Sequence, residues 1–311
     1  MPASEGVTGV ADGAGGLRLI ASAKINLTLE VLSKRDDGFH NLDTVMTTIS
    51  LADEVRLRPA EALSMQFSGR RARDISEDGE LCVAAARAMA QASGRAPNVA
   101  IEVAKRIPVA AGLAGGSSDA AAVLRGLNQL WGLDWSIEEL TDVAASLGSD
   151  VPFFLHAGSA RCTGRGEIVQ PLKDIAPLRL LLLVPPVPPM PDKTVRRFGA
   201  LAHGDFSDGS RSRKLAARLD RGAPPPVRDL VNVFEAVVER SDPELLAHYV
   251  RYRAGRGPAL HLCGAGPTIY LFVTKNVKVA ALRRDYQATG AEVIEASTLS
   301  RADALAITAD A

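Results

Sequence analysis

The sequence predicts an α+β fold in two domains that share a cleft. Its 311 residues exceed the roughly 100 to 200 residues of a typical single domain. Stretches typical of strands and of helices come in segregated runs, whereas a doubly wound sheet requires strict alternation. A content of 47% hydrophobic and 23% charged residues is typical of a globular chain with a large core. We expect an N-terminal domain over residues 17–172 and a C-terminal domain over 173–311.

Charge and cysteine content limit the kinds of partner. Lysine and arginine together number 36, as do aspartate and glutamate, so no overall field favours a nucleic acid or an anionic membrane. Cys82, Cys162 and Cys263 lie far apart without a CxxC pair, which supports neither a disulfide framework nor a zinc site. We therefore expect a small-molecule ligand held by local contacts, in a reducing, cytoplasmic setting.

Neither the first residues nor the most apolar run predicts insertion into a membrane. Residues 1–16 lack the basic and apolar regions of a signal peptide, and we expect them to form a disordered tail. The run Leu180–Val184 is too short to span a bilayer.

The N-terminal half is predicted to begin with a sheet and to continue with helices. Short β-prone stretches alternate with polar turns, and they cover residues 17–23, 26–31, 44–50 and 63–68. Apolar spacing then predicts a helix, a strand and two further helices, over residues 80–93, 98–103, 119–131 and 137–147. Gly94 and Gly148 are the expected C-terminal caps, and Ser136 with Glu139 has the spacing of a capping box.

The C-terminal half is predicted to mix strands and helices around a loop-rich surface segment at residues 201–228. The expected strands cover residues 178–184, 268–273 and 291–296, and the expected helices cover 230–240, 243–255 and 277–289. The loop-rich segment carries the basic residues Arg211, Arg213, Lys214, Arg218 and Arg221. Because no aromatic residues are interleaved with them, they indicate a solvated surface and receive no function.

A glycine-rich segment between the strand at 98–103 and the helix at 119–131 is the first candidate site. It consists of Pro108, Val109, Ala110, Ala111, Gly112, Leu113, Ala114, Gly115, Gly116, Ser117 and Ser118. Glycines before a helix N-terminus let a phosphate approach unpaired backbone N–H groups, and the serine hydroxyls can donate to phosphate or join a Mg²⁺ shell. The segment is neither a Walker A sequence nor GxGxxG. By itself it is equally compatible with a close-packed turn.

Three other positions are ambiguous when each is taken alone. Lys24 is an isolated lysine among apolar residues, which either reaches a surface or serves a site. Asp150 precedes Pro152 and is compatible with a simple cap or turn residue. Gly264 and Gly266 precede an apolar strand, where they form either a tight turn or a second backbone wall near the phosphates.

Together these segments resemble the GHMP kinase superfamily, which combines an N-terminal strand lysine, a central PxxxGLxGGSS loop and a C-terminal glycine turn. Here the turn is CGAGPT. Within the superfamily, residues 21–53, with KIN at 24–26 and DGFH at 37–40, are similar to the start of the 4-diphosphocytidyl-2-C-methyl-D-erythritol kinase family. The segment LGSDVPFF, which contains Asp150, is similar to the segment that holds the catalytic aspartate of that family.

The resemblance implies a two-domain GHMP kinase fold, with a ribosomal-protein-S5-domain-2-like nucleotide-binding domain followed by a ferredoxin-like domain. It implies that ATP, with Mg²⁺, phosphorylates the 2-hydroxyl of 4-diphosphocytidyl-2-C-methyl-D-erythritol, a step of the non-mevalonate isoprenoid pathway. Asp150 would take the proton of that hydroxyl, and Lys24 would keep Asp150 ionised and stabilise charge near the transferred group.

The resemblance also implies a cytosine pocket made by Asn26, Phe39, His40, Thr194 and Phe198. A phenyl ring offers a stacking face, and an imidazole can read the hydrogen-bonding edge of the base. The sequence departs from the family pattern in two ways. Phe39 replaces the common tyrosine, and the loop carries alanine at positions 110, 111 and 114, where many relatives have glycine.

Two alternative functions remain open at this point. One is a GHMP kinase of another alcohol, such as mevalonate or homoserine, against which Phe39 and His40 argue. The other is a nucleotide-binding regulator without catalysis, against which Lys24 and Asp150 argue. The sequence identifies no carboxylate ligand for Mg²⁺, and both a monomer and a homodimer are compatible with it.

Overall fold

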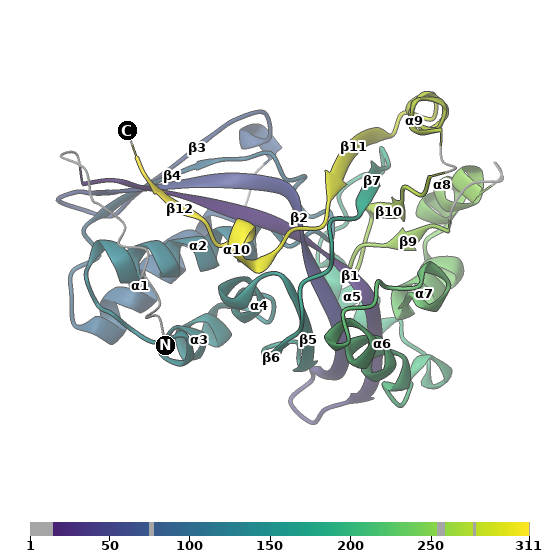
Figure 1. Ribbon diagram of the computed structural model, residues 1–311, viewed down its shortest axis with the longest axis horizontal. Coiled ribbons are helices and arrows are strands. Elements are labelled where there is room, and N and C mark those ends of the chain that lie inside the picture. The colour runs from purple at the N-terminus through teal and green to yellow at the C-terminus, as the bar shows by residue number, and fades with distance from the viewer. Residues whose placement is uncertain (1–14, 75–77, 254–258, 276–277, 311) are drawn as a thin grey trace.

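The computed structural model describes residues 15–74, 78–253, 259–275 and 278–310, which form two β-sheets with helices packed against them (Figure 1). The predicted α+β class is confirmed. The predicted tail lies outside the described residues except for Gly15 and Gly16, and the Gly16 carbonyl accepts a hydrogen bond from the Asp310 N–H (3.2 Å). Of the helices in the described ranges, none combines the length and apolar character needed to cross a bilayer. The division into two domains at residue 172 stays a prediction.

The larger sheet has eight strands within these ranges and is built on a long hairpin, β1–β2. Its order is β12-β1-β2-β4-β3, while β5 pairs with β2 and β6, and β8 pairs with β1. The strands are β1 Leu17–Lys34, β2 His40–Pro59, β3 Ser64–Ser68, β4 Val99–Ala104, β5 Ser159–Gly164, β6 Ile168–Pro171, β8 Val231–Asn232 and β12 Ile307–Ala309. Strands β8 and β12 come from late in the chain, so residues beyond 172 complete this sheet.

Strand β1 joins two stretches that the sequence predicts separately, 17–23 and 26–31. They join because the pairing of β1 with β2 continues through shifts of register, between Ser22 and Lys24 and between Asn26 and Thr28. Such bulges re-aim side chains locally, and these two lie beside the predicted site residues of β1. The strand is anchored along its length, because Leu19, Ile25 and Val31 belong to three different hydrophobic clusters.

Four helices pack on one face of the larger sheet, below it in Figure 1. They are α1 Asp78–Ser93, α2 Gly115–Leu130, α3 Ile137–Leu147 and α4 Val151–His156. The capping box of Ser136 and Glu139 is confirmed, as is the end of α3 at Gly148. Helix α2 begins at Gly115 rather than at the predicted Asp119, so the last glycines of the loop lie within its first turn.

The smaller sheet has four strands in the order β11-β7-β10-β9. They are β7 Arg179–Val184, β9 His261–Leu262, β10 Ile269–Phe272 and β11 Glu292–Ser297. The helices of this half are α5 Lys193–Gly199, α6 Ser210–Asp220, α7 Val233–Ser241, α8 Pro243–Arg253, α9 Val279–Gln287 and α10 Arg301–Ala304. They confirm the predicted helices after residue 230, although residues 254–255 and 277 of those predictions lie outside the described residues.

The prediction of a loop-rich surface over residues 201–228 is wrong at its centre. Helix α6 occupies Ser210–Asp220, and Leu215 and Leu219 are buried one turn apart on its inner face. Ser212 is fully buried, and its N–H donates to Glu30 Oε2 on β1 (2.7 Å). The apolar face is narrow and the rest of the helix is basic, so the helical spacing of its few apolar residues is not evident from the sequence.

Candidate active site

A cavity of about 950 Å³ brings together most of the residues predicted from the sequence. The predicted residues that line it are Lys24, Asn26, Phe39, His40, Pro108, Val109, Ala110, Ala111, Gly112, Ala114, Gly115, Gly116, Ser117, Asp150, Thr194, Phe198 and Gly264. Leu113, Ser118 and Gly266 do not line it. The cavity is thus bounded by β1, the start of β2, the glycine loop, the N-terminus of α4 and helix α5.

The glycine loop and the C-terminal glycine turn contact each other through their backbones. A Cβ on Gly112, whose φ is +84°, would lie 2.1 Å from the carbonyl oxygen of Cys263. A Cβ on Gly264 would lie 3.0 Å from the carbonyl oxygen of Gly112. The N–H of Thr268 also donates to the carbonyl of Ala111 (3.2 Å). Close backbone approach is therefore the structural requirement that glycine meets on both segments.

The first turn of α2 presents backbone N–H groups to the cavity. Gly115, Gly116 and Ser117 line the cavity, and the N-cap residue Ala114 provides no side-chain hydrogen bond to the helix. The first N–H groups of a helix have no partner within it and, with the helix dipole, favour an anion. This end of a 16-residue helix is therefore suited to phosphate.

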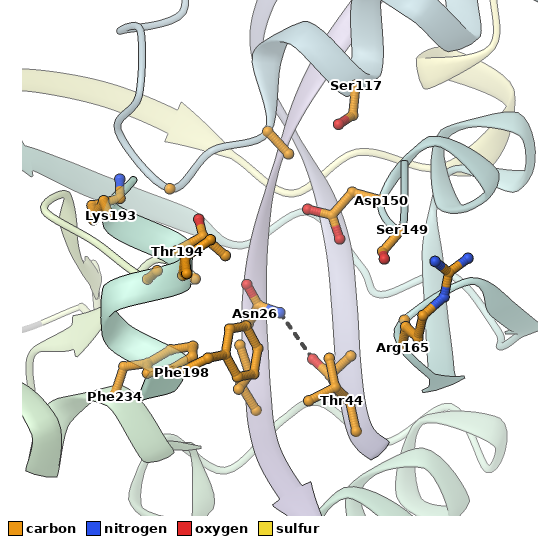
Figure 2. A pocket seen from close by; sticks show the side chains of 18 of the residues that line it. Asn26, Thr44, Ser117, Ser149, Asp150, Arg165, Lys193, Thr194, Phe198 and Phe234 are labelled. Atoms are coloured by element: carbon orange, nitrogen blue, oxygen red, sulfur yellow. Dashed lines mark hydrogen bonds between the residues drawn. The ribbon is translucent and has the colours of Figure 1, made fainter. Parts of the chain in front are cut away.

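Two loop residues point away from the cavity. Leu113 is fully buried in a hydrophobic cluster. The Ser118 hydroxyl donates to the carbonyl of Ser22 on β1 (2.7 Å), and its residue is buried. Because α2 starts at Gly115, Ser117 and Ser118 are consecutive helical residues whose side chains differ in direction by about 100°. Of the two hydroxyls, that of Ser117 therefore faces the cavity (Figure 2).

Alanine occupies the left-handed backbone region at two of the three positions where many relatives have glycine. Ala110 has φ +51° and Ala114 has φ +56°. This conformation costs an L-residue roughly 1–2 kcal/mol. The strain explains why glycine is the usual residue there, and the loop nevertheless keeps its shape.

Lys24 and Asp150 face each other across the cavity floor. Lys24 Nζ lies 3.7 Å from Asp150 Oδ2 and donates to Asn26 Oδ1 (2.7 Å). Asn26 Nδ2 in turn donates to Thr44 Oγ1 (2.9 Å), as Figure 2 shows. The backbone N–H of Lys24 donates to the carbonyl of Leu113 (3.1 Å), which fixes β1 against the glycine loop.

The Asp150 side chain faces the cavity and does not cap the helix that it precedes. Asp150 is the N-cap residue of α4, but its carboxylate makes no capping hydrogen bond. The Asp150 side chain is 34% exposed, whereas that of Lys24 is 5% exposed. In Figure 2 the carboxylate points into the space between Ser117, Asn26 and Thr194. A carboxylate that is exposed and partnered at long range keeps its lone pairs available to accept a proton.

A buried ion cluster lies next to the start of the loop and was not predicted. Lys105 Nζ is 2.7 Å from Asp53 Oδ2 and 2.7 Å from Asp119 Oδ2. Asp53 Oδ1 accepts the N–H groups of Arg106 (2.5 Å) and Ile107 (2.8 Å), the residues that lead into the loop. Burial alone would lower the pKa of Lys105, but the two carboxylates outweigh it and raise that pKa.

Aromatic side chains form the far end of the cavity. The ring of His40 stacks on that of Phe198, with centroids 5.0 Å apart and planes 25° apart. Phe198 in turn meets Phe234 edge-on at 5.0 Å. Burial, together with the charge of Lys34, lowers the pKa of His40, so its imidazole is neutral near pH 7. A neutral imidazole offers one donor and one acceptor to a base edge.

Phe39 is the exposed aromatic of this end. It is 48% exposed, and the guanidinium of Arg165 lies 4.9 Å from its ring centroid. Thr194, at the start of α5, also faces the cavity (Figure 2). These positions place a stacking surface and polar groups within one compartment.

Sequence reasoning missed several polar cavity residues, among them Ser149, Arg165 and Lys193. Ser149 directly precedes Asp150, so its position in the motif was a usable signal. Arg165 follows β5 and Lys193 begins α5, and neither has a local pattern that indicates a cavity. No three His, Cys, Asp or Glu side chains converge as a metal site in the part of the chain that the structure describes.

Comparisons with known proteins show which family the chain is similar to. The model of the GHMP kinases N terminal domain matches residues 80–158. A 4-diphosphocytidyl-2-C-methyl-D-erythritol kinase of Symbiobacterium thermophilum is 42% identical over 79% of this chain and 87% of its own length. One from Dehalococcoides mccartyi is 37% identical over 84% of this chain and 91% of its own length. A crystal structure of a 4-(cytidine 5'-diphospho)-2C-methyl-D-erythritol kinase has a TM-score of 0.72 at 30% identity, and covers 90% of this chain and 98% of that one.

The fold and the cavity together define a GHMP kinase. A mevalonate kinase of L. major, at 15% identity and a TM-score of 0.66, shows the same fold. The identities over most of both chains go further: the chain belongs to the 4-diphosphocytidyl-2-C-methyl-D-erythritol kinase family.

Proposed function

We propose that the chain transfers the γ-phosphoryl group of ATP to the 2-hydroxyl of 4-diphosphocytidyl-2-C-methyl-D-erythritol, giving the 2-phosphate and ADP in the non-mevalonate isoprenoid pathway. Its relatives are named as kinases of this substrate. The observation that carries the proposal is one cavity lined by the N-terminus of α2, the Lys24–Asp150 pair and an aromatic compartment. Each of these parts corresponds to one part of the reaction.

The nucleotide end is assigned to the loop and the start of α2. In this proposal the backbone N–H groups of Gly115 and Gly116 bind phosphate oxygens and the Ser117 hydroxyl donates to them, which is supported by their position in the first turn of α2, lining the cavity. Mg²⁺ is part of the proposal, and the Ser117 hydroxyl and the Asp150 carboxylate are the cavity-lining protein oxygens that would hold it. Such an ion takes most of its ligands from phosphates and water, which fits a site without a cluster of carboxylates, and it neutralises triphosphate charge.

The chemical step is assigned to Asp150 and Lys24. Asp150 accepts the proton of the substrate hydroxyl, and the Lys24 ammonium, held by Asn26, stabilises negative charge on the transferred group. Catalysis beyond this is positioning, because phosphoryl transfer needs little covalent help from the protein. The chain of hydrogen bonds from Lys24 through Asn26 to Thr44 supplies that positioning.

The cytidine end is assigned to Phe39, His40, Thr194 and Phe198. His40 is held by stacking on Phe198, so its imidazole edge is fixed for reading the base. Arg165 covers one face of Phe39. A cytosine stacked on Phe39 therefore takes the opposite face of the ring or displaces Arg165, and stacking contributes about 1–3 kcal/mol.

The aromatic compartment favours this substrate over the alternatives. Mevalonate and homoserine contain no nucleobase that Phe39 and His40 could contact. A regulator without catalysis does not require the Lys24–Asp150 pair. We propose a cytoplasmic setting, supported by the buried, reduced thiols of Cys162 and Cys263 and by the absence of a CxxC pair from the sequence. We also propose that the partners are small molecules rather than nucleic acids or membranes, supported by the balanced charge. Both a monomer and a homodimer agree with the proposal.

The decisive test is ATP consumption by the purified chain with three acceptors in parallel. We expect turnover with the cytidyl substrate and background rates with mevalonate and homoserine. In a His40→Ala variant we expect the KM for the cytidyl substrate to rise by about 10-fold or more, with the KM for ATP unchanged. Turnover with mevalonate or homoserine alone would overturn the assignment, and an unchanged KM in the variant would remove the cytosine pocket.

A further inference from the structure

Lys193 stands at the junction of the three parts of the cavity. It is the first residue of α5, and its side chain lines the cavity together with that of the next residue, Thr194 (Figure 2). Its ammonium donates to two backbone carbonyls, that of Ala110 in the glycine loop and that of Gly266 in the C-terminal turn. One side chain therefore contacts both backbone walls of the proposed phosphate site and lies beside the proposed substrate residues.

The ammonium lacks a counter-charge among the described residues. Its partners there are carbonyl oxygens, and no carboxylate lies within 4.0 Å of it. Nearby charge is mostly of the same sign, since Lys24 and Arg197 both act on it. A partly buried ammonium on neutral acceptors is incompletely compensated, so an anion entering the cavity improves its environment.

We propose that Lys193 is a phosphate-binding residue, whose ammonium leaves the carbonyls of Ala110 and Gly266 and pairs with a phosphate oxygen of a bound substrate. The inference rests on the proposed function, which brings two phosphate-containing molecules into this cavity. The phosphate belongs either to ATP or to the cytidine diphosphate. Lys193 contacts Ala110 in the loop assigned to ATP, and it adjoins Thr194 in the compartment assigned to cytidine. Both phosphates present the same chemistry to an ammonium.

The protonation of Lys193 provides an independent signature. Burial, with the charges of Arg197 on the same helix and Lys24 on β1, lowers its pKa to about 8, and only Cys263 in the turn acts in the opposite direction. The ammonium form, which the role requires, is lost as the pH rises through about 8. An arginine at this position stays charged throughout the working range.

The test compares Lys193→Gln, Lys193→Arg and the control Arg196→Gln, which removes a positive charge from an exposed position of the same helix. Initial rates are measured with ATP and the cytidyl substrate varied in turn. We expect Lys193→Gln to raise the KM for one of them by about 10- to 100-fold, and this identifies the source of the phosphate. We expect Lys193→Arg to stay within about 3-fold of wild type and Arg196→Gln within about 2-fold.

The pH profile separates phosphate binding from a structural role. For the wild type, kcat/KM for the substrate whose KM rises in Lys193→Gln should decrease as the pH rises through about 8. In Lys193→Arg this decrease should be absent. The proposal would be overturned if Lys193→Gln left both KM values unchanged. It would also be overturned if Lys193→Gln raised both KM values equally and lowered the Tm, and Lys193→Arg did not restore the wild-type KM values. Calorimetric titration of ATP and of CDP into wild type and Lys193→Gln compares the dissociation constants without turnover. An inactive wild type would therefore count against the proposed function, while the binding test of Lys193 could still be carried out.

Discussion

Two clusters of lysine and aspartate lie near the glycine loop, and they differ in burial and in distance. Lys105 is 2.7 Å from both Asp53 and Asp119, and the side chains of all three are at most 1% exposed. Lys24 is 3.7 Å from Asp150, whose side chain is 34% exposed. The same chemical groups therefore make a closed structural cluster in one place and an open pair that faces the cavity in another.

The closed cluster holds together three elements that shape the loop. Asp53 belongs to β2, Lys105 follows β4, and Asp119 lies in α2. Asp53 also accepts the N–H groups of Arg106 and Ile107, just before the loop begins. A buried ion cluster is costly to break, because removal of one partner leaves an uncompensated charge. The cluster thus fixes where the loop starts and where α2 begins, which the open pair requires.

The largest expected effect comes from the open pair. Asp150→Asn keeps the shape of the side chain and removes the base, so we expect kcat to fall by about 10² to 10⁴, with ATP affinity nearly unchanged. Because the pair is long and partly exposed, the free energy of unfolding should change by less than about 1 kcal/mol. Steady-state kinetics, ATP titration and urea unfolding measure the three quantities.

Asp142→Asn serves as the matched control, because Asp142 is an exposed carboxylate on α3. Its kcat should equal that of the wild type. Turnover by Asp150→Asn within a few-fold of this control would show that Asp150 is not the base.

The closed cluster should respond in the opposite way. Lys105→Met leaves Asp53 and Asp119 buried without their cation, and we expect it to destabilise the fold by about 3–5 kcal/mol. Urea unfolding measures the loss, and Arg179→Met, which removes an exposed pair with Glu295, should cost at most about 1 kcal/mol. A cost for Lys105→Met no larger than that of Arg179→Met would contradict the contrast between the clusters.

The sequence predicted the open pair and missed the closed cluster for a physical reason. Lys24, Asp150 and the glycine loop each lie in a short motif whose residues act together, so the motif itself carries the information. Lys105 meets Asp53 only through the pairing of β2 with β4, and no local spacing predicts that a charged side chain will be buried. Charge in a sequence indicates surface by default, and a buried cluster is the exception to that rule.

The same default explains the other differences. The basic residues of 210–220 concealed the buried leucines of helix α6. Lys193 and Arg165 enter the cavity from segments that are far from the glycine loop in sequence, so only the packing of the two sheets reveals them. Ser118 was grouped with Ser117 because a sequence does not show at which residue α2 begins. The fold class and most elements follow from periodicity, whereas the directions of individual side chains follow from tertiary packing.

The smallest expected effect concerns the glycine loop itself. Ala110 is exposed and has φ +51°, so Ala110→Gly removes strain without removing packing. The relief of about 1–2 kcal/mol exceeds the entropy that glycine loses on folding, and we expect a net stabilisation of about 0.5–1 kcal/mol. Ala92→Gly, at an exposed position in α1, should instead destabilise by about the same amount. If urea unfolding showed a change in the free energy of unfolding of the same sign for both variants, the left-handed conformation of Ala110 would not be a source of strain. The closed cluster would then hold the loop in a shape that its backbone adopts without strain.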